Sequence, residues 1–236
     1  MIRAVLFDFG GTLFSYETMM NGEGHNLLEL ARGAGVEADL EQILRAQREH
    51  SRRVFKDYSS RPYYRHRDMF NESLRATLEA LGGSPDGELL EGYRDRQWER
   101  HRHDFELRRG VTETLGKLRE RDIHVGMVSN IDDDQLEHLL GVSGIGPYFD
   151  AILSSESARS CKPHGEIFRQ ALESAGCRAD EALFVGDSRT TDVAGANAAG
   201  LHSVLLWQRT DRSPPDGDPR PRHVISEIPQ VLGLLN

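Results

Sequence analysis

The stretch Val5-Leu6-Phe7-Asp8-Phe9-Gly10-Gly11-Thr12 decides how this chain folds, because an apolar run over residues 2–7 ends in a carboxylate and two glycines. A nearly continuous apolar run is typical of a strand buried on both faces of a parallel sheet. Ligands bind outside the carboxyl ends of such strands, so Asp8 is predicted to lie at a binding edge. Gly10 and Gly11 allow the backbone amides to turn inward as a small anion-binding nest.

The same apolar pattern recurs along the chain, separated by stretches with helical character. Further strands are predicted at residues 123–128, 151–153, 182–185 and 202–207, and helices at 111–121, 133–140, 166–175 and 191–199. Alternation of strand and helix predicts an α/β fold with right-handed crossovers. We therefore expect a Rossmann-like, three-layer core around a parallel sheet, closed by a short strand and a helix within residues 224–235.

Residues 16–108 break this alternation and show helical patterns only, at 27–32, 40–55, 69–81 and 89–103. We predict that they form an α-helical cap domain, inserted into a catalytic core made of residues 1–15 and 109–236. Within this insert, residues 45–67 carry eight Lys or Arg against two acidic residues. Such a stretch could contact an anionic substrate, but for any single residue the sequence favours a solvated helix face.

Composition excludes several classes of partner. A chain of 236 residues can bury one core plus a smaller insert, and its net charge of −9 argues against nucleic acid or an anionic membrane as a partner. The first apolar run is too short for a signal peptide or a membrane span. The two cysteines, Cys161 and Cys177, show no metal-binding spacing, so reduced thiols in a cytoplasmic protein are expected.

Three further pieces of sequence carry polar side chains suited to the chemistry of Asp8. They are Met127-Val128-Ser129-Asn130, Cys161-Lys162-Pro163, and the stretch from Val185 to Asp192 that contains Asp187. Mg²⁺ prefers oxygen ligands, and one or two carboxylates plus a substrate phosphate are enough to hold it. The set therefore predicts a nucleophilic Asp8 that attacks a phosphoryl group and forms an aspartyl-phosphate. Nest amides at Gly11 and the amide group of Asn130 are candidate phosphate ligands.

The order and spacing of these pieces resemble the haloacid dehalogenase superfamily of aspartate-nucleophile hydrolases over nearly the whole chain. The resemblance implies a helical cap and catalytic roles for Asp8, Ser129 and Lys162. It also implies Mg²⁺ bound by Asp8, the backbone carbonyl of Gly10 and Asp187, with Asp192 orienting this metal site. Two positions keep a structural alternative, because Ser129 could cap the following helix and Asp192 could be a helix N-terminal acid.

Gly10 departs from the family pattern, in which phosphatases usually carry a second Asp two residues after the nucleophile. General acid–base help of the kind that this Asp supplies is worth roughly 100- to 10,000-fold. Gly10 cannot supply it. Either the leaving group departs without protonation, as in an acyl phosphate or a sugar 1-phosphate, or a cap residue or water replaces the acid, or the enzyme is not a conventional phosphomonoesterase.

The function favoured by this pattern is a Mg²⁺-dependent phosphatase for a small phosphorylated metabolite. Alternatives are a 2-haloacid dehalogenase, a phosphonatase-like enzyme that uses Lys56, and a catalytically impaired phosphate-binding module. Dehalogenating members of the family need no Mg²⁺, so the pair Asp187 and Asp192 argues against the first alternative. No local motif supports the role of Lys56.

Overall fold

The computed structural model describes residues 1–16, 23–208, 213 and 216–236. The chain forms two compact units, residues 1–16 with 106–236 and residues 17–105, of which 17–22 lie outside the described part. The sequence divides the chain at slightly different points, after residues 15 and 108. Residues 106–108 group with the first unit because Phe14 and Leu107 form an antiparallel bridge and the Arg108 N–H donates to the Leu13 carbonyl at 2.8 Å.

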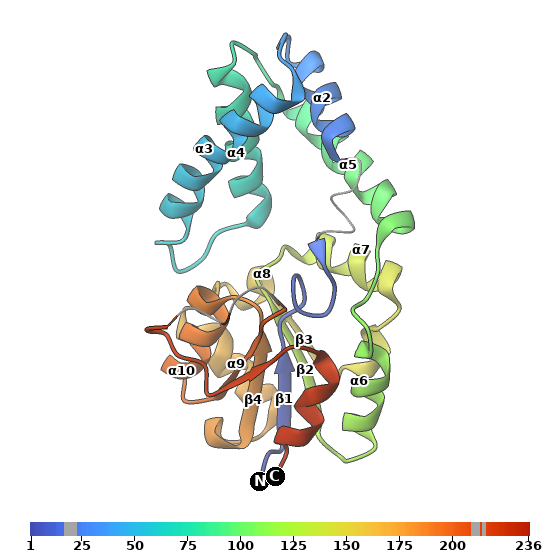
Figure 1. Cartoon of the computed structure of the whole chain (residues 1–236), viewed down its shortest axis with the longest axis vertical. Helices are drawn as coiled ribbons and strands as arrows, with labels where there is room; N and C mark the ends of the chain where they lie inside the picture. The colour runs from blue at the N-terminus through green and yellow to red at the C-terminus, as the bar shows by residue number, and fades with distance from the viewer. Residues whose placement is uncertain (17–22, 209–212, 214–215) are drawn as a thin grey trace. The chain divides into compact units, whose positions relative to one another are not determined.

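A six-stranded parallel sheet forms the centre of the first unit, in the order β3-β2-β1-β4-β5-β6 (Figure 1). The strands are β1 (Ala4–Phe7), β2 (His124–Ser129), β3 (Ala151–Ser154), β4 (Ala182–Gly186), β5 (His202–Leu206) and β6 (His223–Ile225). β1 lies between β2 and β4, so that Leu6 is in register with Gly126 on one side and Phe184 on the other. The carboxyl ends of these three strands therefore share one edge of the sheet.

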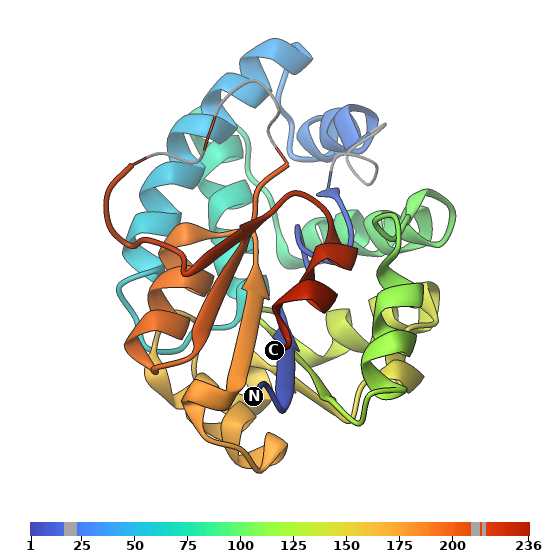
Figure 2. The same cartoon turned by 60° about the horizontal axis from the view of Figure 1, so that its bottom comes forward.

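Helices cover both faces of this sheet, which confirms the three-layer α/β prediction (Figures 1 and 2). On one face lie α9 (Gly165–Ala175) and α10 (Ala194–Ala198), and on the other lie α6 (Val111–Arg119) and the 3₁₀ helix η4 (Ile228–Leu234). The connections include α7 (Asp133–Ser143), α8 (Ser155–Ala158) and three short turns of helix, η1 (Gly146–Tyr148), η2 (Ala179–Glu181) and η3 (Arg189–Val193).

Burial on both faces explains the unbroken apolar run of β1. Leu6 and Phe184 pack against Phe168 of α9, with the rings of Phe168 and Phe184 5.0 Å apart. Val5 and Phe7 alternate with Leu6 along the strand and are also fully buried. Because successive side chains of a strand point to opposite faces, a doubly covered strand needs apolar residues at every position.

Two elements differ from the sequence prediction. The stretch 191–199 is not one helix, since a π-helical turn, η3, precedes the short α10. The Asp192 and Val193 N–H groups both donate to the Ser188 carbonyl in this wide turn, and the turn carries Asp192 into the interior. The closing helix is also short, because residues 228–234 form a 3₁₀ helix with a proline in its first turn.

Four helices make up the described part of the second unit: α2 (Glu23–Gly33), α3 (Leu40–Tyr58), α4 (His66–Ala80) and α5 (Gly87–Asp104). Leu30, Ile43, Leu78 and Leu90 supply one buried side chain from each helix to a shared core. α3 begins at a capping box, in which Asp39 accepts from the Gln42 N–H at 2.8 Å while the Gln42 side chain accepts from the Asp39 N–H at 2.9 Å. The four helices are those that the sequence predicts; their action as a cap stays a prediction.

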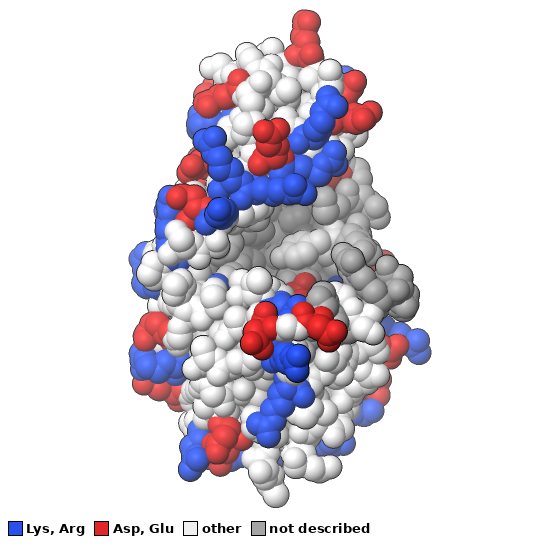
Figure 3. Space-filling model, turned by 60° about the vertical axis from the view of Figure 1, so that its left-hand side comes forward, with Lys and Arg blue, Asp and Glu red and all other residues white. Residues whose placement is uncertain are grey.

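Lys and Arg side chains gather on the face of the helical unit drawn in Figure 3, the side on which α3 and α4 lie. At the end of α3, Arg61 pairs with Asp57 at 2.5 Å and lies 3.9 Å over the Tyr58 ring. Contact of this face with an anionic substrate stays a prediction. Among the residues that the structure describes, no helix has the length and apolar character needed to cross a bilayer.

Candidate active site

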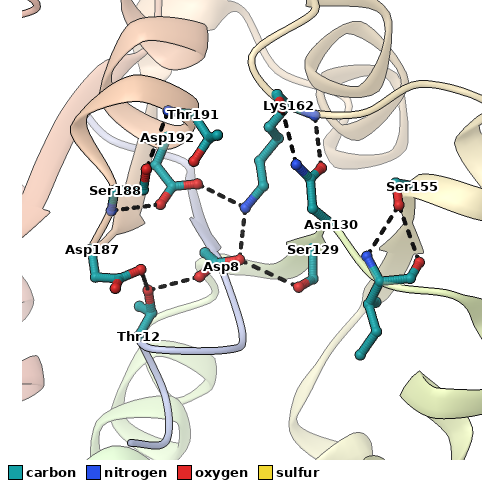
Figure 4. Close-up of polar contacts among 11 residues, drawn as sticks. Asp8, Thr12, Ser129, Asn130, Ser155, Lys162, Asp187, Ser188, Thr191 and Asp192 are labelled. Atoms are coloured by element: carbon teal, nitrogen blue, oxygen red, sulfur yellow. Dashed lines mark hydrogen bonds and ion pairs between the residues drawn. The ribbon is translucent and has the colours of Figure 1, made fainter. Parts of the chain in front are cut away.

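The acidic side chains predicted from sequence meet at the carboxyl edge of the sheet (Figure 4). Asp8 follows β1 directly and Asp187 follows β4 directly, while Asp192 enters from the turn η3. One carboxylate oxygen from each of the three lies within 4.8 Å of the others. Parallel pairing of β1 with β4 produces this meeting, because it places equivalent ends side by side.

Lys162 lies between two of these carboxylates. Its Nζ is 2.7 Å from Asp8 Oδ1 and 2.8 Å from Asp192 Oδ1, and the whole residue is buried. Burial opposes the charge on Lys162, but the carboxylates of Asp192 and Asp8 outweigh it and raise the pKa of the lysine. The ammonium group therefore stays charged and holds both carboxylates in place.

Asn130 positions Lys162 through the backbone. The Asn130 Nδ2 donates to the Lys162 carbonyl at 3.0 Å, and the Asn130 Oδ1 accepts from the Lys162 N–H at 2.7 Å. Both ends of the amide group thus serve to fix the lysine loop. The phosphate contact that the sequence predicts for Asn130 stays a prediction beside this positioning role.

Ser129, the last residue of β2, donates from its Oγ to Asp8 Oδ1 at 3.3 Å and is buried. The N-cap of α7 is Asp132, three residues further along the chain. Ser129 therefore belongs to the acidic cluster and is not the cap of the following helix.

Thr12 is a site residue that sequence reasoning missed. Its Oγ1 donates to Asp8 Oδ2 at 2.9 Å and lies 3.4 Å from Asp187 Oδ1, so it links the ends of β1 and β4. Thr12 stands in the same short motif as Asp8, four residues later, which is the signal that could have identified it.

The turn between Asp8 and Thr12 depends on Gly11 and on Arg108. The sequence did not reveal the part that Arg108 plays. Gly11 has φ +86°, and a Cβ on it would lie 2.5 Å from Asp187 Oδ2. Its carbonyl accepts from Arg108 Nε at 3.1 Å and from Arg108 Nη2 at 2.7 Å. A guanidinium from a distant segment therefore fixes the turn that follows Asp8.

The cluster contains more carboxylates than cations among its named members, and this affects protonation. Asp187 lies at the exposed rim, where loss of part of its hydration and the nearby Asp8 raise its pKa to about 6. Burial raises the pKa of Asp192, while Lys162 opposes that rise. Three carboxylates that converge with one ammonium group form a donor set that fits a divalent cation with oxygen ligands.

Comparison with known proteins agrees with this geometry. A family model described as haloacid dehalogenase-like hydrolase matches residues 2–200, so the chain belongs to that family and is a hydrolase. It is 31% identical to a ribulose-1,5-bisphosphate 5-phosphatase of Halopiger xanaduensis over 207 residues, 87% of this chain and 85% of that protein. It is also 30% identical to a glyceraldehyde 3-phosphate phosphatase of Methanopyrus kandleri, over all of this chain and 97% of that protein.

The fold agrees with solved structures. The HAD-hydrolase YfnB from Bacillus subtilis, in a crystal structure bound to magnesium, superposes with a TM-score of 0.79 at 23% identity, covering 100% of this chain and 99% of that one. At this level of identity the likeness is one of fold.

Proposed function

We propose that this hydrolase is a Mg²⁺-dependent phosphatase that acts on a small phosphorylated metabolite through an aspartyl-phosphate on Asp8. One observation carries the proposal: the Asp8 carboxylate is held at both oxygens by Thr12, Ser129 and Lys162, beside two further carboxylates. Relatives named as phosphatases of a sugar bisphosphate and of a triose phosphate support the substrate class.

Each side chain has a defined task in this reaction. Asp8 supplies the nucleophilic oxygen, and Lys162 offsets negative charge first on the nucleophile and then on the bound phosphoryl group. Asp8, the Gly10 carbonyl and Asp187 would hold Mg²⁺, with Asp192 orienting the site. The ion, when bound, supplies positive charge that reduces repulsion between a carboxylate and a phosphate dianion.

In the same proposal, the helical second unit acts as a lid. Lids exclude water from a reacting phosphate and commonly set substrate choice. The basic stretch on α3 and α4 suits an anionic substrate. Free thiols at Cys161 and Cys177 are consistent with a cytoplasmic enzyme.

Phosphate release from a panel of phosphorylated metabolites, with Mg²⁺ and with a chelator, tests the proposal. Wild type should release phosphate only with Mg²⁺, and Asp8→Asn should lose this activity. Asp180→Asn is the matched control, because Asp180 is exposed and pairs with Arg178 at 2.9 Å, outside the cluster. Phosphate release that survives in Asp8→Asn would contradict the proposal, as would metal-independent halide release from 2-haloacids.

A further inference from the structure

Gly10 leaves a space that another residue of the same unit fills. A Cβ built on Gly10 would lie 2.0 Å from the Tyr16 hydroxyl oxygen and 2.8 Å from Tyr16 Cζ. Both distances are too short for a real Cβ atom. The Tyr16 hydroxyl therefore occupies the volume into which any side chain at position 10 would project. One residue can use this space only if the other leaves it.

The local backbone brings Tyr16 back to Gly10. Residues 11–13 form a turn, and Gly10 and Phe14 are joined by a bridge across it. The Tyr16 ring then packs edge-on against the Phe14 ring, with centroids 5.2 Å apart. Phe14 is itself fully buried, so the support under the tyrosine belongs to the core of the unit.

The hydroxyl end of Tyr16 lies within the field of the acidic cluster. The residue as a whole is 54% exposed, but its hydroxyl reaches the space beside Gly10, two residues after the nucleophile. A phenol has an ordinary pKa of about 10 and so keeps its proton at neutral pH. The Tyr16 hydroxyl can therefore act as a hydrogen-bond donor in this space.

We propose that the Tyr16 hydroxyl donates a hydrogen bond to the leaving-group oxygen of the phosphate ester, in the space that Gly10 leaves open. This role rests on the proposed phosphatase function and answers the loss of an acid at position 10. A donor aimed at charge that develops in the transition state lowers the barrier without giving up its proton. Tyr16 is thus a catalytic residue in the core unit.

The step balances without a further reactant. An oxygen of Asp8 attacks phosphorus, the ester P–O bond breaks, and its electron pair stays on the leaving oxygen. The Tyr16 hydrogen bond stabilises that negative charge, and a water molecule then gives the oxygen a proton and becomes hydroxide. A second water attacks the phosphorus of the aspartyl-phosphate, the P–O bond to Asp8 breaks, and the proton that this water releases neutralises the hydroxide. The net reaction is one ester plus one water to alcohol plus phosphate.

This role narrows the substrate class. A hydrogen bond stabilises a leaving oxygen less than full protonation does, so the enzyme should favour esters whose leaving group is a weak base. Acyl phosphates, sugar 1-phosphates and aryl phosphates belong to this class. Simple alkyl phosphates should be poorer substrates.

The test uses a series of substituted phenyl phosphates whose leaving groups differ in basicity. With Tyr16→Phe, which keeps the ring on Phe14, kcat/KM should fall by roughly 100-fold for phenyl phosphate. The fall should be much smaller for para-nitrophenyl phosphate, whose leaving group needs little help. The plot of log kcat/KM against leaving-group pKa should therefore become steeper, whereas a merely structural defect would lower all substrates alike. Tyr148→Phe, a tyrosine of η1 outside the cluster, should keep the wild-type slope.

A second pair of variants tests the shared space. Tyr16→Ala empties it, and adding Gly10→Asp to that variant should restore part of the activity through a carboxyl group grown from position 10. Gly10→Ala alone should displace the hydroxyl and reproduce the steeper slope of Tyr16→Phe. A wild-type slope in Tyr16→Phe would overturn the role of Tyr16, and a wild-type slope in Gly10→Ala would show that the two residues do not compete for this space.

Different results would contradict the phosphatase function and the role of Tyr16. If wild type hydrolyses the aryl phosphates and Asp8→Asn does not, while Tyr16→Phe keeps the wild-type slope, the phosphatase stands and the Tyr16 role is wrong. If wild type releases no phosphate from any of them with Mg²⁺ present, both proposals are wrong.

Discussion

Two adjacent glycines serve different purposes at the scale of single residues. Gly10 has no side chain, and the Tyr16 hydroxyl uses the space. Gly11 has a left-handed backbone conformation and lies against Asp187. A Cβ at this position would strain the backbone and collide with the Asp187 side chain. At both positions, the loop that follows Asp8 therefore depends on the absence of a Cβ atom.

Gly11→Ala should therefore reduce both stability and activity. Ala at φ +86° is strained, which costs on the order of 1 kcal/mol of unfolding free energy. The new Cβ also pushes on Asp187, so phosphate release should fall further than stability predicts. Denaturant unfolding and phosphate-release assays on the same preparation measure the two effects.

Gly176→Ala separates these causes, because Gly176 has φ +59° but no atom within 4 Å of the added Cβ. It should lose stability through strain alone and keep its activity. Equal activity in the Gly11 and Gly176 variants would show that contact with Asp187 does not matter.

At the scale of secondary structure, the ends of three strands position the site. β1, β2 and β4 finish at one edge and deliver Asp8, Ser129 and Asp187. The segment before α6 then adds Arg108, which donates twice to the Gly11 carbonyl. Arg108 therefore acts as a brace, which joins the start of the second core segment to the loop that follows Asp8.

Arg108→Ala should lower phosphate release by roughly 10- to 100-fold, the usual range when a group that orients a metal site is removed. The loss should appear mainly in kcat, because the Asp8 loop becomes less well placed. Arg121→Ala is the control, since Arg121 is exposed and makes one long contact of 3.3 Å with the Leu232 carbonyl. If both variants behave alike in kinetics, Arg108 is not a brace.

The residues at the strand ends could be predicted from the sequence, but the paths of the loops could not. Asp8 and Asp187 could be found because apolar runs reveal buried strands, and a parallel sheet brings strand ends together. Tyr16 and Arg108 reach the site through a tight turn and a bridge between residues far apart in sequence, which periodicity does not encode. The π-turn that carries Asp192 inward was likewise missed, because the sequence favours an ordinary helix there.

At the scale of the whole molecule, the chain combines a parallel α/β unit, which holds the acidic cluster, with a separate helical unit, whose described part contains four helices around a core of their own. The sequence separated the two because apolar strand runs stop between residues 16 and 108 and resume afterwards. Each unit buries its own apolar side chains, and the acidic cluster lies in the core unit. A ligand that binds the cluster should therefore stabilise the core unit.

Mg²⁺ should raise the melting temperature of the wild-type protein, because a ligand that binds only the folded state stabilises it, by about 2.7 kcal/mol at 100 times its dissociation constant. Asp187→Asn should lose most of this shift, since it removes one carboxylate of the cluster. Asp180→Asn should keep it. The same shift in all three proteins would place the Mg²⁺ site elsewhere.

Asp8 should become phosphorylated during turnover, and rapid-quench mass spectrometry can detect this aspartyl-phosphate. Wild type mixed with an aryl phosphate and Mg²⁺, then quenched in acid, should carry one phosphoryl group on the peptide that contains Asp8, formed as fast as the alcohol is released. Turnover with no phosphoryl group on that peptide, or with the group on another residue, would show that Asp8 is not the nucleophile.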